Sequence, residues 1–128
     1  MAAKLVYKIS PRAAWDAAVD AGTFTGAPVD VADGFIHFST AEQVAETAAK
    51  HFRGQGDLVL IAIDAAALGA DLKWEPSRGG ALFPHLYAPL DVAHARHVVD
   101  LPLDAAGVPV IPVDLAVETG QGGLDTPC

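Results

Sequence analysis

The sequence predicts an α+β fold in a single compact domain, and three observations support this. The chain has 128 residues, of which 52% are hydrophobic, so it can bury one core and hardly two. Its apolar residues switch along the chain between strand-type runs and helix-type spacing. The nearly continuous apolar run at residues 58–63 is typical of a central strand covered on both faces. We expect the domain to span residues 1–116 and residues 117–128, which lack apolar periodicity, to form a disordered tail.

Composition and charge exclude several classes of partner. Sixteen Asp and Glu against eight Lys and Arg give a formal net charge of −8, so a broad positive surface for DNA or RNA is absent, whereas a small phosphate-bearing ligand stays open. No apolar run approaches the roughly 20 residues that span a bilayer. The single cysteine, Cys128, excludes an internal disulfide framework and a Cys-rich zinc site. We therefore expect a cytoplasmic protein that binds neither DNA nor membrane, with its oligomeric state left open.

The first half of the chain predicts one strand, one helix and a long loop. Residues 5–9 are rich in β-branched and aromatic types and predict a strand. Ser10 and Pro11 then predict the cap and first residue of a helix. Its core-facing side includes Trp15 and Val19, and it ends at Gly22. Residues 22–33 carry Gly, Thr, Pro and Asp in quick succession. This segment is expected to be a loop that forms the wall or lid of a pocket.

The second half predicts a further helix and several short strands. A helix is expected at residues 41–52, and one capped helical turn after Asp64. Residues 71–75 and 83–87 predict strands, and Pro84 suggests that the latter lies at a sheet edge or begins there. Residues 95–103 and 108–113 predict a hairpin around the turn at 104–107.

A strand-to-helix corner at residues 33–40 holds the first candidate site residue, His37. Ser39 and Glu42 have the spacing of a capping box, and the N-terminus of the helix that they would open favours anions such as phosphate. Two interpretations of His37 remain open. The histidine either bonds a carbonyl oxygen and closes the corner, or it orients a ligand beside the helix.

A second group of polar and aromatic residues lies between residues 73 and 87. Glu75 and Arg78 either form a surface ion pair, worth at most about 1 kcal/mol, or act separately on a ligand. In the second case Glu75, held against the Trp74 ring, would take a proton or bond a sugar hydroxyl, and Arg78 would hold a phosphate. His85 and Tyr87 are two residues apart and share one face of a strand.

Neither a metal site nor a standard nucleophile is predicted. His37 and His85 lack a third dependable ligand for a metal ion. No G-x-S-x-G elbow, P-loop or G-x-G-x-x-G fingerprint occurs. We therefore expect no metal cofactor.

Three motifs in order along the chain closely resemble the bacterial domain-of-unknown-function family 952 (DUF952): DGFIHFST at 33–40, LKWE at 72–75 and FPHLY at 83–87. The resemblance runs from about the first strand to the last hairpin. It implies a fold similar to that of the ADP-ribosyltransferase group, in which two small, mostly antiparallel sheets frame an NAD-type cleft with helices packed alongside.

The resemblance also implies a role for the corner. The segment from His37 to Ser39 looks like the H-x-S element of ADP-ribosyltransferases and RNA 2′-phosphotransferases, whose histidine contacts the nicotinamide ribose. Those enzymes carry a glutamate near the end of the fold, whereas here Glu75 precedes Tyr87, and Glu118 lies in the expected tail.

The resulting hypothesis is an NAD- or nucleotide-binding enzyme of the ADP-ribosyltransferase or phosphotransferase type. His37 would orient a ribose and Glu75 would stabilise positive charge at an anomeric carbon. The candidate cofactor-binding residues are Ser39, Thr40, Trp74, Arg78, His85 and Tyr87. Two alternatives stay open: a small-molecule binding protein without turnover, in which Arg78 already neutralises Glu75, and a protein-interaction module with an exposed aromatic patch.

Overall fold

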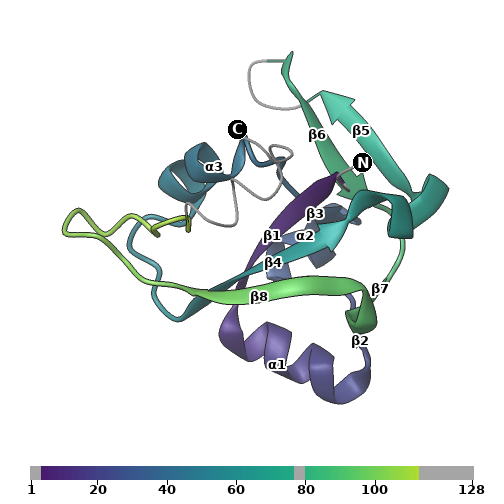
Figure 1. The fold of residues 1–128 in the computed structure, drawn as a ribbon, viewed down its shortest axis with the longest axis horizontal. Coiled ribbons are helices and arrows are strands. Elements are labelled where there is room, and N and C mark those ends of the chain that lie inside the picture. Colours follow the sequence, from purple (N-terminus) through teal and green to yellow (C-terminus); the bar gives the residue numbers. More distant parts are fainter. Residues whose placement is uncertain (1–3, 77–79, 113–128) are drawn as a thin grey trace.

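The structure is a computed structural model, and it describes residues 4–76 and 80–112. In these residues it confirms an α+β domain with antiparallel sheets (Figure 1). Two three-stranded sheets and a two-stranded ribbon are present, so one more sheet forms than the sequence predicted. The three α-helices are α1 (Arg12–Ala21), α2 (Pro28–Asp33) and α3 (Val44–His51). The described residues also contain the 3₁₀ segments η1 (Ala65–Asp71) and η3 (Val92–His94).

The first sheet has the order β1-β4-β8 and forms the centre of the fold. It consists of β1 (Leu5–Pro11), β4 (Leu58–Asp64) and β8 (Ala95–Leu101). The middle strand, β4, is buried over most of its length, as its continuous apolar run predicted. One face packs on α1 and the other on α3, which lie on opposite sides of the sheet in Figure 1. Alternate residues of β1 and β4 therefore enter two separate clusters.

The second sheet has the order β3-β6-β5, with β3 (Ile36–His37), β6 (Leu82–Leu86) and β5 (Leu72–Pro76). Its apolar residues, among them Ile36 and Leu86, join the cluster that contains α1, so both sheets share one core. The ribbon pairs β2 (Thr23–Phe24) with β7 (Leu90–Asp91). A bridge between Tyr7 and Ser39 connects the free edge of β1 to the chain that leaves β3.

Several predicted details are wrong, each for a local reason. The helix predicted after Ser10 begins at Arg12, because Pro11 remains the last residue of β1. Val19, expected on the core face of that helix, has 52% of its surface exposed. Residues 22–33 are not simply a loop, since they contain β2 and α2, although they do form a pocket wall as expected. α2 escaped prediction because six residues are too few to show helical periodicity.

Pro84 lies in the central strand of its sheet, so the expected edge position is wrong. Its carbonyl accepts a hydrogen bond from the Phe38 amide at 3.0 Å, on the side where β3 has only two residues. Proline has no N–H to donate back to Phe38, but the residues after Phe38 leave β6 at this point and pair with Tyr7 instead. Proline is tolerated in this central strand because the neighbouring strand stops there.

The remaining predictions are met in part: α3 is shorter than the helix expected at 41–52, and residues 108–112 form no strand. The turn at 104–107 forms, with the Asp104 amide bonded to the Val108 carbonyl at 2.9 Å and a bridge between Leu103 and Pro109. Asp64 caps the 3₁₀ segment η1. The proposed tail at 117–128 lies outside the described residues. Among residues 4–76 and 80–112, no helix combines the length and apolar character that a membrane crossing requires.

Candidate functional site

The site begins where two neighbouring strands part. Ser39 and Tyr7 exchange two backbone hydrogen bonds, each 2.8 Å long. Going back along the chain from Ser39, residues 36–38 turn away from β1 and bond to β6 instead. A wedge opens between β1 and β3, and the Asp30 side chain of α2 fills its narrow end.

Asp30 is the hub of the wedge, with a side chain that is fully buried. It accepts hydrogen bonds from the Ala27 amide at 2.8 Å, from the His37 amide at 3.1 Å and from His37 Nδ1 at 2.6 Å. The Lys8 ammonium group lies 2.7 and 2.9 Å from its two oxygens. Asp30 thus ties α2, β1 and β3 together, and it orients the His37 ring.

The environment of Asp30 favours its ionised form. Burial alone would raise the pKa of the carboxyl group, but the hydrogen bonds from His37 and the charge of Lys8 outweigh it and lower the pKa to about 2. Burial lowers the pKa of Lys8, while the pair with Asp30 opposes this. Asp30 therefore stays charged at neutral pH and balances the buried ammonium group.

His37 bridges two carboxylates. Its Nε2 lies 2.9 Å from Asp33 Oδ2, while Nδ1 faces Asp30. A neutral imidazole has only one N–H, so both contacts are hydrogen bonds only when the ring carries a proton on each nitrogen. Asp33 is half-exposed, whereas Asp30 is buried. A ligand could therefore displace Asp33 from Nε2 without disturbing the inner contact.

A second histidine, His85, is held in a similar way by Glu75. His85 Nδ1 lies 2.8 Å from Glu75 Oε1, and the Tyr87 hydroxyl donates to the same oxygen at 2.7 Å. The hydrogen bonds from His85 and Tyr87 lower the pKa of Glu75, and the bond to Glu75 raises the pKa of Tyr87. Glu75 is therefore an ionised carboxylate that positions His85.

Phe35 connects the two histidines. Its ring stacks on His85 with 4.3 Å between centroids and lies 4.6 Å from His37. The two imidazole rings approach each other edge to face at 5.5 Å. They are neighbours because β3 and β6 pair in the register that places His37 opposite His85. Two carboxylate-bound histidines thus share one end of the site.

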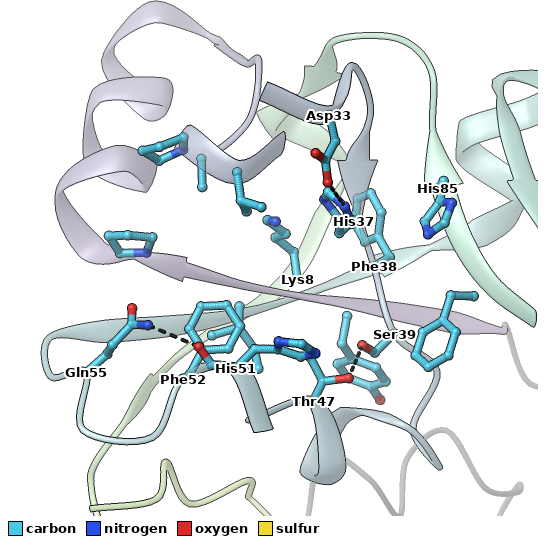
Figure 2. Close-up of a pocket in the computed structure, with 17 residues that line it drawn as sticks. Lys8, Asp33, His37, Phe38, Ser39, Thr47, His51, Phe52, Gln55 and His85 are labelled. Carbon is cyan, nitrogen blue, oxygen red and sulfur yellow. Dashed lines mark hydrogen bonds and ion pairs between the residues drawn. The ribbon is translucent and has the colours of Figure 1, made fainter. Parts of the chain in front are cut away.

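Both histidines line a cavity of about 580 Å³. Figure 2 shows β1 crossing the cavity, with His37 and His85 at one end and Phe52 and Gln55 toward the other. The N-terminal part of α2 and the C-terminal part of α3 form its sides. Small-molecule sites commonly have volumes of about 300–1,000 Å³. The cavity therefore has the size of a ligand pocket.

The structure brings together most of the predicted site residues, but not all. His37, His85 and Ser39 line the cavity. Glu75 and Tyr87 stand behind His85 and contact it directly or through Glu75. Thr40 is absent from the lining, and its amide donates to Gln43 Oε1 at 3.0 Å. Arg78 lies outside the described residues.

Trp74 and Ser39 differ from their predicted settings. Trp74 neighbours Glu75 on β5 and therefore projects from the opposite face of the sheet, where Lys4 lies 4.6 Å from its ring. Ser39 does not cap a helix. Its backbone pairs with Tyr7 and its hydroxyl group lies 3.0 Å from Thr47 Oγ1. The predicted capping box at Ser39 and Glu42 is therefore wrong, because the turn at Thr40 and Gln43 precedes the helix instead.

Sequence reasoning missed the carboxylates and cations that complete the site. Asp30 and Asp33 were hidden in the supposed loop, yet Pro28 followed by Asp30 is a helix-start pattern that could have indicated α2. Lys8 looked like an ordinary residue of an alternating strand. His51 and Thr47 line the cavity from α3. Among the described residues, no group of three His, Cys, Asp or Glu is placed to hold a metal ion.

Comparison with known proteins places the chain in a family. Residues 9–98 match the family described as a protein of unknown function, DUF952. The chain belongs to the DUF952 family. The DUF952 resemblance noted from the three motifs is thus confirmed, whereas the likeness to ADP-ribosyltransferases stays a prediction. Among curated proteins, none matches this chain.

Solved structures of protein CC0527 from Caulobacter crescentus are similar to this DUF952 chain. A crystal structure is 62% identical, covers 83% of this chain and 93% of its own, and superposes with a TM-score of 0.81. A crystal structure of a double mutant of the same protein is 60% identical with the same TM-score of 0.81. A solution structure is 63% identical, covers 82% and 90% of the two chains, and has a TM-score of 0.74.

Proposed function

We propose that the cavity binds a nucleotide of the NAD type, with its ribose at the end formed by His37 and His85. The observation that carries this proposal is the pair of imidazoles, 5.5 Å apart and each bound at Nδ1 by a carboxylate, in the wall of one cavity. Imidazole nitrogens that are fixed in this way suit the hydroxyl groups of a ribose, because they donate or accept along defined directions.

The charge at the His37 end of the cavity suits the nicotinamide part of an oxidised nicotinamide nucleotide. The Lys8 charge is matched by Asp30, and Asp33 adds a further carboxylate at the cavity. The positive pyridinium ring of NAD⁺ would be favoured by that carboxylate and by the aromatic surface of Phe83. The resemblance to the ADP-ribosyltransferase group points to the same ligand class through its H-x-S element, here His37 to Ser39.

Transfer of the ADP-ribosyl group is the reaction that this binding mode would serve. In hydrolysis, water would attack the anomeric carbon, nicotinamide would leave with the bonding electron pair, and the proton of the water would pass to a base. Glu75 does not itself line the cavity, so it would act indirectly, by holding the His85 ring that it contacts. The ribose would displace Asp33 from His37 Nε2, and this nitrogen would then orient the ribose.

Binding without turnover is the second candidate, and one observation favours it. Glu75 Oε1 already accepts hydrogen bonds from both His85 and Tyr87, which leaves this oxygen less able to stabilise a developing positive charge. Long incubation with NAD⁺ separates the two candidates, because only the transferase releases nicotinamide.

Isothermal titration with NAD⁺ tests the proposal. His37→Gln and His85→Gln are each expected to weaken NAD⁺ binding by about tenfold, because each variant loses one hydrogen bond from an oriented imidazole to the ribose. His97→Gln is the matched control, because His97 lies on β8 and does not line the cavity. Absence of binding by the unmodified protein, or an equal loss in all three variants, would contradict the proposal.

A further inference from the structure

At the free edge of β1, beside the cavity, one pair of backbone groups has no backbone partner among the described residues. In an antiparallel ladder, successive residues direct their N–H and C=O groups to opposite sides. Tyr7 directs both groups away from β4, to Ser39. The even-numbered residues face β4: the Ala65 amide donates to the Lys4 carbonyl and the Arg12 amide donates to the Asp57 carbonyl, each at 2.9 Å. Ile9 therefore directs its N–H and C=O to the same free edge as Tyr7.

No backbone group of residues 4–76 and 80–112 pairs with Ile9 at that edge. Continuing the register from Tyr7 and Ser39 would place His37 opposite Ile9, but the His37 amide bonds to Asp30 instead. Ile9 lines the cavity, and the strand ends at Pro11, which has no N–H to offer. Backbone groups in such a setting need a partner from solvent or a ligand. The parting of β1 and β3 has thus left room beside Ile9 for another strand.

We propose that a short extended peptide adds to this edge of β1 and pairs with the N–H and C=O of Ile9. This is β-strand addition, in which backbone hydrogen bonds provide affinity and alternate side chains enter pockets. Beyond Tyr7, which Ser39 already occupies, the edge from Lys8 to Pro11 covers three residue steps, about 10 Å at the usual strand rise, so three or four residues of a peptide lie directly against it. Figure 2 shows Phe52 and Gln55 on the side of β1 opposite Lys8.

The walls indicate which peptide fits. Ala27, Pro28 and Val29 on one side and Phe52 on the other are apolar and line the cavity, so they suit an aliphatic side chain. Asp33 is the one carboxylate of the described lining, and the whole chain has a net charge of −8. The occupant is therefore an extended peptide with a central aliphatic residue and basic flanking residues, since an acidic peptide would be repelled.

This peptide site stands independently of the nucleotide proposal. It uses backbone atoms of β1 and the walls near Phe52, whereas the nucleotide proposal uses the side chains of His37 and His85 at the other end of the cavity. Failure of NAD⁺ to bind leaves the peptide site in place, and failure of the peptide leaves the nucleotide proposal in place.

Amide hydrogen exchange of the full-length, ¹⁵N-labelled chain tests the peptide site. The probe is the acetylated and amidated peptide Lys-Val-Leu-Val-Lys. In the free protein we expect the Ile9 amide to exchange faster than those of Tyr7 and Lys8, which are bonded within the sheet, and to become protected when the peptide binds. An Ile9 amide that is already protected in the free chain, or that the peptide leaves unchanged, overturns the proposal.

Backbone methylation of the probe gives a second, independent signature. In a strand, alternate amides face the partner strand. Methylation of the one amide that donates to the Ile9 carbonyl should weaken binding by at least about fivefold, the cost of one lost hydrogen bond, while methylation of the two amides beside it should leave binding nearly unchanged. Equal losses at every position contradict strand addition. The same peptide with glutamate in place of lysine should bind more weakly, and equal binding would contradict the charge argument.

A pair of wall variants localises the peptide. Val29 and Val31 both lie on α2 and are largely exposed, but only Val29 belongs to the cavity lining. Val29→Lys should weaken the binding of the lysine-flanked probe by at least about fivefold, through charge repulsion and a lost apolar contact. Val31→Lys should have little effect. The reverse order would show that the peptide binds elsewhere.

Discussion

The side chain of Asp30 connects α2, β1 and β3. It accepts three hydrogen bonds from Ala27 and His37 and pairs with the buried ammonium group of Lys8. Removing one partner of a buried ion pair leaves the other as an uncompensated charge, which costs far more than the pair contributes when it is intact. Stability, the position of α2 and the orientation of His37 therefore all depend on one carboxylate.

Asp30→Asn should lower the free energy of unfolding at pH 7 by about 3–5 kcal/mol, because Lys8 is then buried without a counter-charge. Urea unfolding measures this change. Asp57→Asn is the matched control: Asp57 lies 2.8 Å from Arg12 Nε but is exposed, so its loss should cost less than about 1 kcal/mol. Similar losses in the two variants would contradict the central role of Asp30.

Acid should remove the contribution of Asp30 in a defined range of pH. The pKa of Asp30 in the folded chain, about 2, lies below its ordinary value of 3.8, so its contribution is fully present above the ordinary value and is lost as the pH falls toward the folded value. A difference of this size corresponds to roughly 2 kcal/mol. The difference in unfolding free energy between the wild type and Asp30→Asn should therefore narrow between pH 5 and pH 2. Urea unfolding across that range measures it, and a difference that stayed constant with pH would show that Asp30 is not responsible.

At the scale of single elements, α2 can approach β1 only because Gly26 precedes it. Gly26 has φ +119°, and a Cβ atom there would lie 2.6 Å from Asp30 Cβ. Gly34, at the other end of the same helix, has φ +90° but open space around it. The two glycines thus separate the cost of backbone strain from the cost of a steric clash.

Gly26→Ala should destabilise the domain more than Gly34→Ala does. The Gly34 variant should lose about 1–2 kcal/mol through its left-handed backbone alone, and the Gly26 variant about 1–3 kcal/mol more, because the added methyl group displaces Asp30. Thermal or urea unfolding gives both values. The Gly26 variant should also disturb the NMR signals of the His37 ring, and unchanged signals would show that α2 accommodates the methyl group without moving Asp30.

The elements that the sequence predicted well were those with a strong local pattern. The apolar run of β4 indicated a buried strand and the helical spacing around Trp15 indicated a helix with one core face; β4 is buried, and α1 buries Trp15 and Ala18. The helix α2 was not predicted, because six residues carry no periodicity. The strand expected at the strand-to-helix corner does form as β3, but with only two residues. Pro84 misled the prediction for β6, since its tolerance depends on where a distant strand ends.

The candidate site was predictable in part for the same reason. His37 and His85 belong to distinctive motifs, and their meeting follows once β3 pairs with β6. The roles of Lys8 and Asp30 depend on a contact between residues 22 positions apart, which no local pattern encodes. The separation of Trp74 from Glu75 could have been foreseen, because neighbouring residues of a strand face opposite sides.

At the scale of the whole molecule, the two three-stranded sheets are joined into one structural unit. One core cluster contains Val6 and Ile61 of the first sheet together with Ile36 and Leu86 of the second. Two further contacts cross the wedge between the sheets: the bridge between Tyr7 and Ser39 and the ion pair of Lys8 with Asp30. Neither sheet can separate from the other without exposing shared core surface.

The two tryptophans allow this coupling to be measured. Trp15 lies on α1 and is buried in the shared core, and Trp74 lies on β5 with 37% of its surface exposed. In Trp74→Phe the fluorescence reports on the first sheet, and in Trp15→Phe it reports on the second. Within each variant, fluorescence and far-ultraviolet circular dichroism should give the same urea midpoint, because a shared core unfolds as one cooperative unit. If fluorescence from Trp74 changed at a lower urea concentration than the circular dichroism of the same variant, the second sheet would unfold separately and the site between the sheets would be lost before the core.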